Sequence, residues 1–152
     1  MFLNRSELRS KLGRDPIVGF TCSTFDLLHA GHVVMLQEAK ELCDYLVVGL
    51  LSDPTVDRPD SKNKPVQSMV ERYLQVSGCK YVDEVIPFER EQDIVDLILI
   101  LNPDVRIVGE EYQGKEHTGK GLCPVHYNKR RHSFSTTELR DRVSVANKGH
   151  SR

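Results

Sequence analysis

The stretch that decides the fold reads C-S-T-F-D-L-L-H-A-G-H and runs from Cys22 to His32. An apolar run at 17–20 precedes it, and an amphipathic segment at 33–42 follows it. This order predicts a strand, a tight turn and a helix. Such a junction points backbone N–H groups and the positive end of a helix dipole at one spot, which suits a bound phosphate group.

Two histidines mark the start of the predicted helix. His29 and His32 are three residues apart and would share one helix face. Gly31 between them allows a ligand to approach the backbone, while Thr24 and Asp26 add a hydroxyl and a carboxylate just upstream. Either protonation state of the imidazoles can donate hydrogen bonds to phosphoryl oxygens. A lone histidine here is usually a capping residue, but the pair around a glycine favours a phosphate site.

The stretch T-F-D-L-L-H-A-G-H, from Thr24 to His32, resembles the H-x-G-H signature of the cytidylyltransferase-like nucleotidyltransferases. Within that family the sequence is most similar to the glycerol-3-phosphate cytidylyltransferase type. The ADP-heptose, phosphocholine and phosphoethanolamine enzymes share the signature. The resemblance extends over about residues 16–143, which is most of the chain.

The rest of the chain alternates between strand and helix patterns. Strands are predicted at about 17–22, 46–51, 81–88, 105–109 and 122–127, and helices at about 31–42, 66–78, 91–101 and 136–143. The continuous apolar run at 46–51 is typical of a strand covered on both faces. We therefore predict an α/β fold, a single-domain, Rossmann-like, doubly wound parallel sheet of about five strands. Residues 1–15 form an N-terminal extension, 16–143 the nucleotidyltransferase domain and 144–152 a polar C-terminal tail.

Capping signals mark two helix starts and the extension. Ser68 and Glu71 form an S-x-x-E capping box, as do Ser135 and Glu138. In the extension, Asn4 or Ser6 is a candidate cap for a short helix. The extension could be a packing arm, a dimer contact or a mobile tail.

Composition excludes several classes. The 152 residues carry 21 basic and 22 acidic side chains, a net charge of −1, so no global attraction to nucleic acid is expected. The short basic run at 129–132 is weak evidence for a nucleic-acid binder. No apolar run approaches the length of a membrane span, and residues 1–15 do not read as a signal peptide. Four scattered cysteines without a C-x-x-C pair favour free thiols in a cytoplasmic protein.

The resemblance also implies the site. It places catalytic groups at His29, His32, Lys64 and Arg130. It assigns nucleotide contacts to Cys22, Ser23, Thr24, Phe25, Asp26, Gly31, His32, Arg72, Lys80, Gly109, Arg130, Ser135, Thr136 and Thr137. Acceptor contacts fall to Lys62, Lys64, Glu111 and Tyr112, and of the two lysines Lys64 is favoured. Ser23 and Lys80 depart from the family pattern, which has Gly and Arg at these positions.

The implied activity joins a nucleoside triphosphate, CTP by preference, to a small phosphorylated alcohol such as glycerol 3-phosphate. Pyrophosphate leaves after in-line attack. Mg²⁺ is expected to accompany the triphosphate, with Asp26 as a candidate ligand, and a homodimer is expected. Two alternatives stay open. One is an adenylyl- or cytidylyltransferase acting on a sugar phosphate, phosphoethanolamine or phosphocholine. The other is a regulatory module that binds a nucleotide without turnover.

Overall fold

The computed structural model describes residues 2–149. In chain order its elements are α1 (Arg5–Leu12), β1 (Val18–Ser23), α2 (Ala30–Glu41), β2 (Tyr45–Leu51), α3 (Met69–Ser77), β3 (Glu84–Phe88), α4 (Asp93–Leu101), β4 (Val105–Gly109), the 3-10 helix η1 (Glu110–Tyr112), β5 (Val125–Asn128) and α5 (Thr136–Lys148). The alternation of strands and helices confirms the predicted α/β class.

The five strands form one parallel sheet in the order β3-β2-β1-β4-β5. The strand order reverses after β3, because the chain returns to the other side of β1 through α4. In such sheets ligands bind beyond the carboxyl ends of the strands, next to the point where the order reverses. That point lies between β1 and β4.

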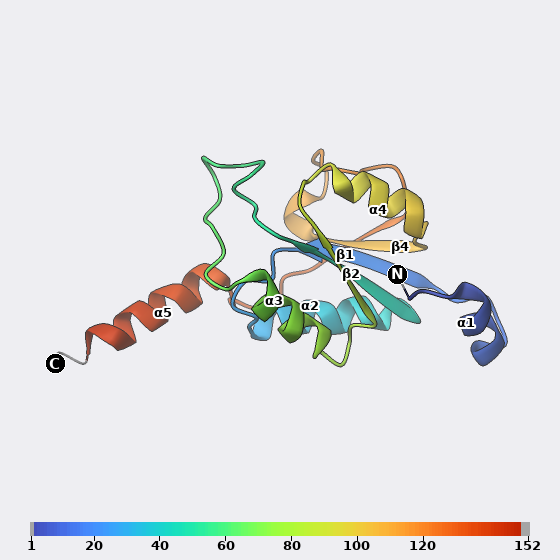
Figure 1. Cartoon of the computed structure of the whole chain (residues 1–152), viewed down its shortest axis with the longest axis horizontal. Coiled ribbons are helices and arrows are strands. Elements are labelled where there is room, and N and C mark those ends of the chain that lie inside the picture. The colour runs from blue at the N-terminus through green and yellow to red at the C-terminus, as the bar shows by residue number, and fades with distance from the viewer. Residues whose placement is uncertain (1, 150–152) are drawn as a thin grey trace.

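Helices cover both faces of the sheet, as the doubly wound prediction requires. Helices α2 and α3 lie on one face and α4 on the other (Figure 1). The core between the sheet and α4 contains Val18, Phe20, Val47, Leu51, Phe88, Ile94, Ile98 and Leu101. The core on the opposite face contains Phe25, Leu36, Ala39, Leu46, Val48, Leu50, Val76 and Ile107. Strand β2 is buried almost throughout, as its apolar run predicts.

The described part of the N-terminal extension contacts the end of α4. Asn4 caps α1 by accepting a hydrogen bond from the Glu7 N–H. Arg5 donates to the carbonyl oxygens of Leu101 and Asn102, at 2.8 and 2.7 Å, and so ties the arm to the end of α4. Of the three roles left open for this segment, the structure supports packing.

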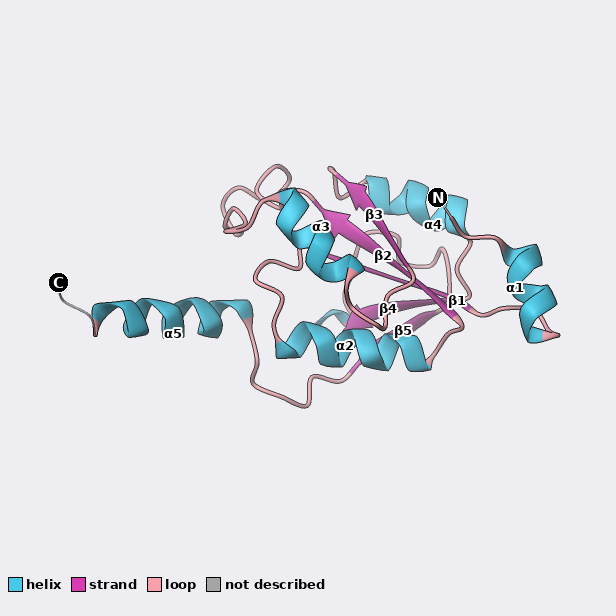
Figure 2. Ribbon diagram, turned by 60° about the horizontal axis from the view of Figure 1, so that its bottom comes forward, coloured by secondary structure: helices cyan, strands magenta, loops and turns pink. Residues whose placement is uncertain are grey.

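Several predicted boundaries are wrong. Strand β3 begins at Glu84 rather than residue 81, and β5 runs from Val125 to Asn128 instead of 122–127. Helix α5 continues to Lys148, so the polar tail predicted from residue 144 is helical up to that residue. Residues 150–152 of that tail lie outside the described part of the chain. Helix α5 buries none of its residues and projects away from the sheet (Figure 2).

Disulfide bonds and membrane-spanning helices are both absent from the described residues. Cys22, Cys43, Cys79 and Cys123 all carry free thiols. Between residues 2 and 149, none of the helices combines the length and the apolar character that spanning a bilayer needs.

Candidate active site

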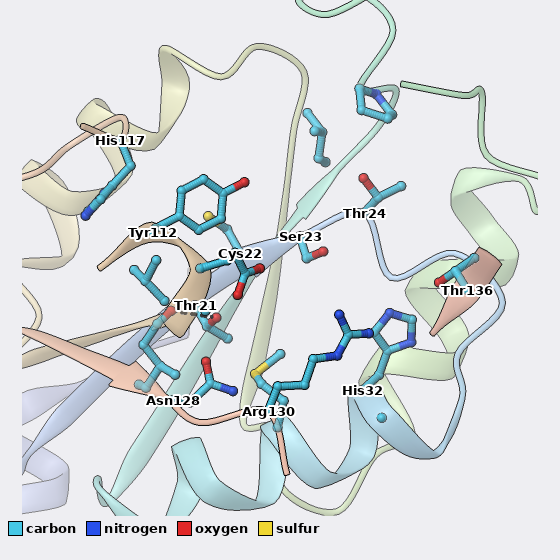
Figure 3. Close-up of a pocket in the computed structure, with 18 of the residues that line it drawn as sticks. Thr21, Cys22, Ser23, Thr24, His32, Tyr112, His117, Asn128, Arg130 and Thr136 are labelled. Carbon is cyan, nitrogen blue, oxygen red and sulfur yellow. Dashed lines mark hydrogen bonds between the residues drawn. The ribbon is translucent and has the colours of Figure 1, made fainter. Parts of the chain in front are cut away.

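A cavity of about 420 Å³ opens at the carboxyl edge of the sheet. The end of β1, the start of α2, the loop after β2, the end of β4 and the entry to α5 all contribute to its wall (Figure 3). The segments that the sequence singled out therefore meet at one place. The predicted residues that line the cavity are Cys22, Ser23, Thr24, His29, Gly31, His32, Lys62, Gly109, Glu111, Tyr112, Arg130 and Thr136.

The turn between β1 and α2 has an unusual backbone. Phe25 and Leu27 adopt left-handed conformations, with φ of 50° and 51°. Such conformations are strained for residues other than glycine and persist where surrounding contacts fix them. Phe25 is buried in the core, and the N–H of Leu27 donates to the side chain of Gln67 at 2.7 Å. These contacts hold the turn at the cavity edge.

The two histidines cap their own helix. His29 is the N-cap of α2, and its Nδ1 accepts a hydrogen bond from the Gly31 N–H at 3.0 Å. The Nδ1 of His32 accepts one from the His29 N–H at 3.2 Å. A neutral imidazole that accepts at Nδ1 carries its proton on Nε2. Both rings therefore carry their proton on Nε2, and that of His29 faces the Thr136 hydroxyl.

The rings of His29 and His32 stack with their centroids 3.8 Å apart. His29 Nε2 lies 3.2 Å from the Thr136 hydroxyl, which fixes that ring from the side of α5. Gly31 is required by this crowding, because a Cβ there would lie 2.9 Å from the His29 ring and 2.8 Å from the His132 ring. The pair is thus held rigidly, which is the preorganisation that transition-state stabilisation needs.

Both histidines are neutral at physiological pH. Burial, followed by the neighbouring His29, lowers the pKa of His32 to about 3. Burial, and then the charges of Arg130 and His132, also lower the pKa of His29. The sequence left the protonation state open, and the structure favours the neutral form for both rings.

The lowered pKa of His32 makes stability depend on pH. The pKa of His32 in the folded chain, about 3, lies below the ordinary value of 6.5. Between these two pH values His32 is protonated in the unfolded chain and neutral in the folded chain. The free energy of unfolding is expected to fall by about 3 kcal/mol as pH drops from 6.5 to 4. Urea denaturation across this range measures it. In the His32→Asn variant the free energy of unfolding should change clearly less with pH. An equal pH dependence in the variant and the parent chain would contradict the lowered pKa of His32.

Arg130 and Thr136 complete the wall beside the histidines. The Arg130 guanidinium donates to the Phe134 carbonyl oxygen at 2.7 Å and lies next to His32 (Figure 3). Thr136 opens α5, whose N-cap Ser135 accepts a hydrogen bond from the Glu138 N–H, which is the Ser135 half of the predicted capping box. A guanidinium, two N–H donors and a helix N-terminus together form a strong anion site.

Asp26 does not fit the role of a metal ligand. Its carboxylate accepts hydrogen bonds from the N–H groups of Val66 and Gln67 and from Arg140, at 2.9 to 3.0 Å. Burial alone would raise the pKa of Asp26, but these donors together lower it, so the carboxylate stays charged. Its oxygens are already occupied in joining the turn, the loop after β2 and α5. Across residues 2–149 the structure gathers no three His, Cys, Asp or Glu side chains that suit a metal ion.

Arg72 lies outside the cavity, contrary to the expectation that it holds phosphate. Its side chain is buried in α3, with a residue exposure of 2%. Its guanidinium donates to four backbone carbonyl oxygens, those of Thr24, Leu51, Ser52 and Gln67. Arg72 therefore positions the ends of β1 and β2, and its contacts are structural.

Several other residues that were predicted to contact a substrate do not line the cavity. Lys62 lines the cavity, whereas the favoured Lys64 does not. The ammonium group of Lys80 lies 5.1 Å from the Tyr81 ring centroid, away from the site. Phe25, Ser135 and Thr137 also fall outside the lining, although Phe25 and Ser135 shape the segments that form it.

The cavity includes basic residues that sequence reasoning missed. They are Arg58, Arg106, His117 and His132. A signal for Arg106 exists, because it is a charged residue within the apolar strand V-R-I-V-G, and such a residue needs a reason to be there. His117 and Arg58 sit in polar loops, where no pattern marks them.

Comparisons with known proteins agree with this geometry. A model of the cytidylyltransferase-like family matches residues 20–142. The bifunctional protein HldE of Campylobacter concisus is 41% identical over 116 residues, which cover 76% of this chain but 24% of that protein. The chain thus spans about a quarter of the length of this relative. The glycerol-3-phosphate cytidylyltransferase of Bacillus subtilis is 38% identical over 128 residues, covering 82% of this chain and 95% of that protein.

Among solved structures, the lipopolysaccharide core biosynthesis protein from Thermoplasma volcanium superposes with a TM-score of 0.55 at 24% identity. The match covers 87% of this chain and 89% of that one. At this identity the likeness concerns the fold, which it supports independently.

Proposed function

The chain belongs to the cytidylyltransferase-like family and carries a nucleotidyltransferase domain, and from this premise we propose that it joins CTP to a small phosphorylated alcohol, with glycerol 3-phosphate as the preferred acceptor. One observation carries the proposal. Two neutral imidazoles offer Nε2–H donors at the start of α2, beside the Arg130 guanidinium, in the cavity at the sheet edge.

The reaction needs positioning and charge stabilisation more than covalent help. An oxygen of the acceptor phosphate attacks the α-phosphorus of the nucleotide and forms the new P–O bond. The bond between the α-phosphorus and the oxygen that bridges to the β-phosphate breaks in line, and pyrophosphate leaves with that oxygen. His32 donates a hydrogen bond to an α-phosphoryl oxygen, and His29 does so by exchanging its hydrogen bond to the Thr136 hydroxyl for one to the phosphoryl group. Arg130 balances the added charge.

Mg²⁺ is expected to arrive with the triphosphate and to be coordinated by its phosphate oxygens. Asp26 is not proposed as its ligand, because its carboxylate already accepts hydrogen bonds from three protein donors. We assign no other residue of the chain to the ion.

The acceptor is proposed from the relatives. The Bacillus subtilis glycerol-3-phosphate cytidylyltransferase aligns over nearly its whole length, which favours glycerol 3-phosphate. A sugar phosphate is the second candidate, with CTP or ATP as the donor, because the H-x-G-H signature is shared with the ADP-heptose enzymes. Phosphoethanolamine and phosphocholine follow.

Pyrophosphate release tests the proposal. The purified chain is assayed with Mg²⁺ and each of CTP, ATP, GTP and UTP against glycerol 3-phosphate, phosphoethanolamine, phosphocholine and a set of sugar phosphates. Turnover with CTP and glycerol 3-phosphate supports the proposal. Turnover with another pair replaces the substrates and keeps the chemistry. Nucleotide binding without turnover on any pair would instead favour the regulatory module.

Arg130→Lys is expected to raise the KM for CTP about tenfold or more and to change kcat less. Lysine keeps the charge but loses the planar fork that binds two phosphate oxygens. Steady-state kinetics with varied CTP at saturating acceptor measure the change. Arg131→Lys is the matched control, because Arg131 is exposed and does not line the cavity. Equal KM values for the two variants would remove Arg130 from the nucleotide site.

A further inference from the structure

Arg106 presents a buried positive charge without a countercharge. It lies in β4 and is 5% exposed. Its Nη1 donates to the Thr118 carbonyl oxygen at 2.5 Å, and its Nη2 lies 4.0 Å from the Cys22 sulfur. Its Nε has no hydrogen-bond partner. Within residues 2–149 no carboxylate lies within ion-pair distance of this guanidinium.

A buried guanidinium is stable only if it is paired and hydrogen-bonded. The neighbouring Cys22 does not supply the countercharge, since burial raises the pKa of its thiol and keeps it neutral. The Nε–Nη2 edge of Arg106 therefore holds two donors that no protein oxygen uses. Two donors on one edge of a guanidinium match two oxygens of a phosphate.

Arg106 lines the same cavity as the two histidines. Its contacts are with Cys22 and with the loop at Thr118, whose neighbour His117 also lines the cavity. Figure 3 shows His117 and Tyr112 on one side of Cys22, and His32, Arg130 and Thr136 on the other. In this view His117, the neighbour of the Thr118 that Arg106 binds, thus lies across Cys22 from His32 and Arg130.

The end near Arg106 has few other free donors. The nearby Arg58 has a carboxylate at hand, because its Nε lies 3.6 Å from Glu91. His117 donates to or accepts from the Tyr127 hydroxyl through Nε2, at 3.2 Å, and its buried Nδ1 has no hydrogen-bond partner. Arg58, Arg106 and His117 each have a buried nitrogen without a hydrogen-bond partner, but of the three only Arg58 has a carboxylate within ion-pair distance, which leaves Arg106 and His117 as the candidates for an anion.

We infer that Arg106 and His117 form an anion subsite that binds the phosphate group of the acceptor. The inference rests on the proposed function and deepens it by assigning the second substrate to its own end of the cavity. Arg130 and the start of α2 serve the nucleotide at the opposite end. Arg106 holds two oxygens of the acceptor phosphate, and the third remains free to attack the α-phosphorus.

Binding without turnover tests the subsite first. Isothermal titration calorimetry of the full chain with inorganic phosphate, and separately with glycerol 3-phosphate, is run without nucleotide. Arg106→Gln is expected to weaken both affinities about tenfold or more, because a charged hydrogen-bond donor is lost. CTP affinity should change by less than about threefold. A loss of CTP affinity with unchanged phosphate affinity would overturn the inference.

Kinetics give the second readout. Arg106→Gln is expected to raise the KM for the acceptor about tenfold or more while the KM for CTP stays within about threefold. Lys120→Gln is the matched control, because it removes a positive charge from the same loop. The native Lys120 pairs with Glu116 at 3.2 Å and does not line the cavity. An equal rise in acceptor KM for Lys120→Gln would indicate a general charge effect and would overturn the assignment.

Because Arg106 also holds the Thr118 carbonyl, its glutamine variant risks misfolding. His117→Asn then serves, since the side chain lies at the same subsite and carries no charge to replace. It is expected to weaken phosphate binding severalfold, and unchanged binding would overturn the inference.

The calorimetry does not depend on turnover. If the chain turns over no substrate pair but binds phosphate in a way that depends on Arg106, the subsite stands and the proposed function is wrong. If the chain turns over CTP and the acceptor with a KM for the acceptor that does not depend on Arg106, the proposed function stands and the subsite is wrong.

Discussion

His32→Asn is expected to fold normally and to lose about 10²–10³-fold in kcat. The asparagine Oδ1 can take the place of Nδ1 and accept the hydrogen bond from the His29 N–H, which preserves the start of α2. No donor remains where the Nε2–H stood. The loss therefore measures one preorganised donor to the α-phosphoryl oxygens. Single-turnover or steady-state pyrophosphate release with saturating substrates gives the value.

The matched control is His126→Asn. His126 lies in β5, pairs with Glu38 at 3.2 Å and does not line the cavity. Its kcat should remain within about threefold of the parent chain. If His32→Asn shows an unchanged thermal midpoint and a kcat no lower than that of His126→Asn, His32 is not catalytic and acts only as a helix cap.

Arg72→Met is expected to produce the largest loss of stability, about 3–5 kcal/mol in the free energy of unfolding. Methionine fills much of the volume but donates no hydrogen bonds. The carbonyl oxygens of Thr24, Leu51 and Ser52 would then lie at the ends of β1 and β2 without their donor. Urea denaturation gives the free energy and, through the slope, shows whether unfolding stays two-state.

Arg142→Met controls for the loss of an arginine, because Arg142 is an exposed residue of α5 and should change stability by less than about 0.5 kcal/mol. The opposite pattern would be informative. An Arg72→Met chain of normal stability but with a raised KM for CTP would restore the phosphate-binding role that the family resemblance implied.

The sequence was sufficient for the class of fold and for several of the segments that line the cavity. The strand-turn-helix order around Thr24 to His32 and the capping box at Ser68 and Glu71 are local patterns, and the structure contains both. Local patterns of this kind are readable because neighbouring residues decide them. The family assignment is confirmed for the same reason, since its signature is local.

Contacts between distant segments were harder to predict. Arg72 was read as a phosphate ligand, yet it stands on the face of α3 that includes Val76, four residues on, which is buried. That spacing signals an inward arginine, and only the fold shows that its partners are carbonyl oxygens. Lys62 and Lys64 differ by two positions in an irregular loop, so no periodicity could decide which faces the cavity.

The last helix ends beyond the predicted Val143, because the chain carries no glycine or proline stop signal at that position. The sequence reaches a glycine only at Gly149, the C-cap, and polar helix formers up to that point allow α5 to continue. The homodimer, the cytoplasmic location and Mg²⁺ stay predictions.

The projection of α5 has a practical consequence for anyone who modifies the chain. The side chains that connect this helix to the site, Thr136 to His29 and Arg140 to Asp26, are near its beginning. No residue of the helix is buried, so its later turns gain little from tertiary packing and are expected to fray. An affinity tag or a fused domain placed after Gly149 would therefore be joined to turns of α5 that make no contact with the cavity. Such a fusion should leave the geometry around His29 intact.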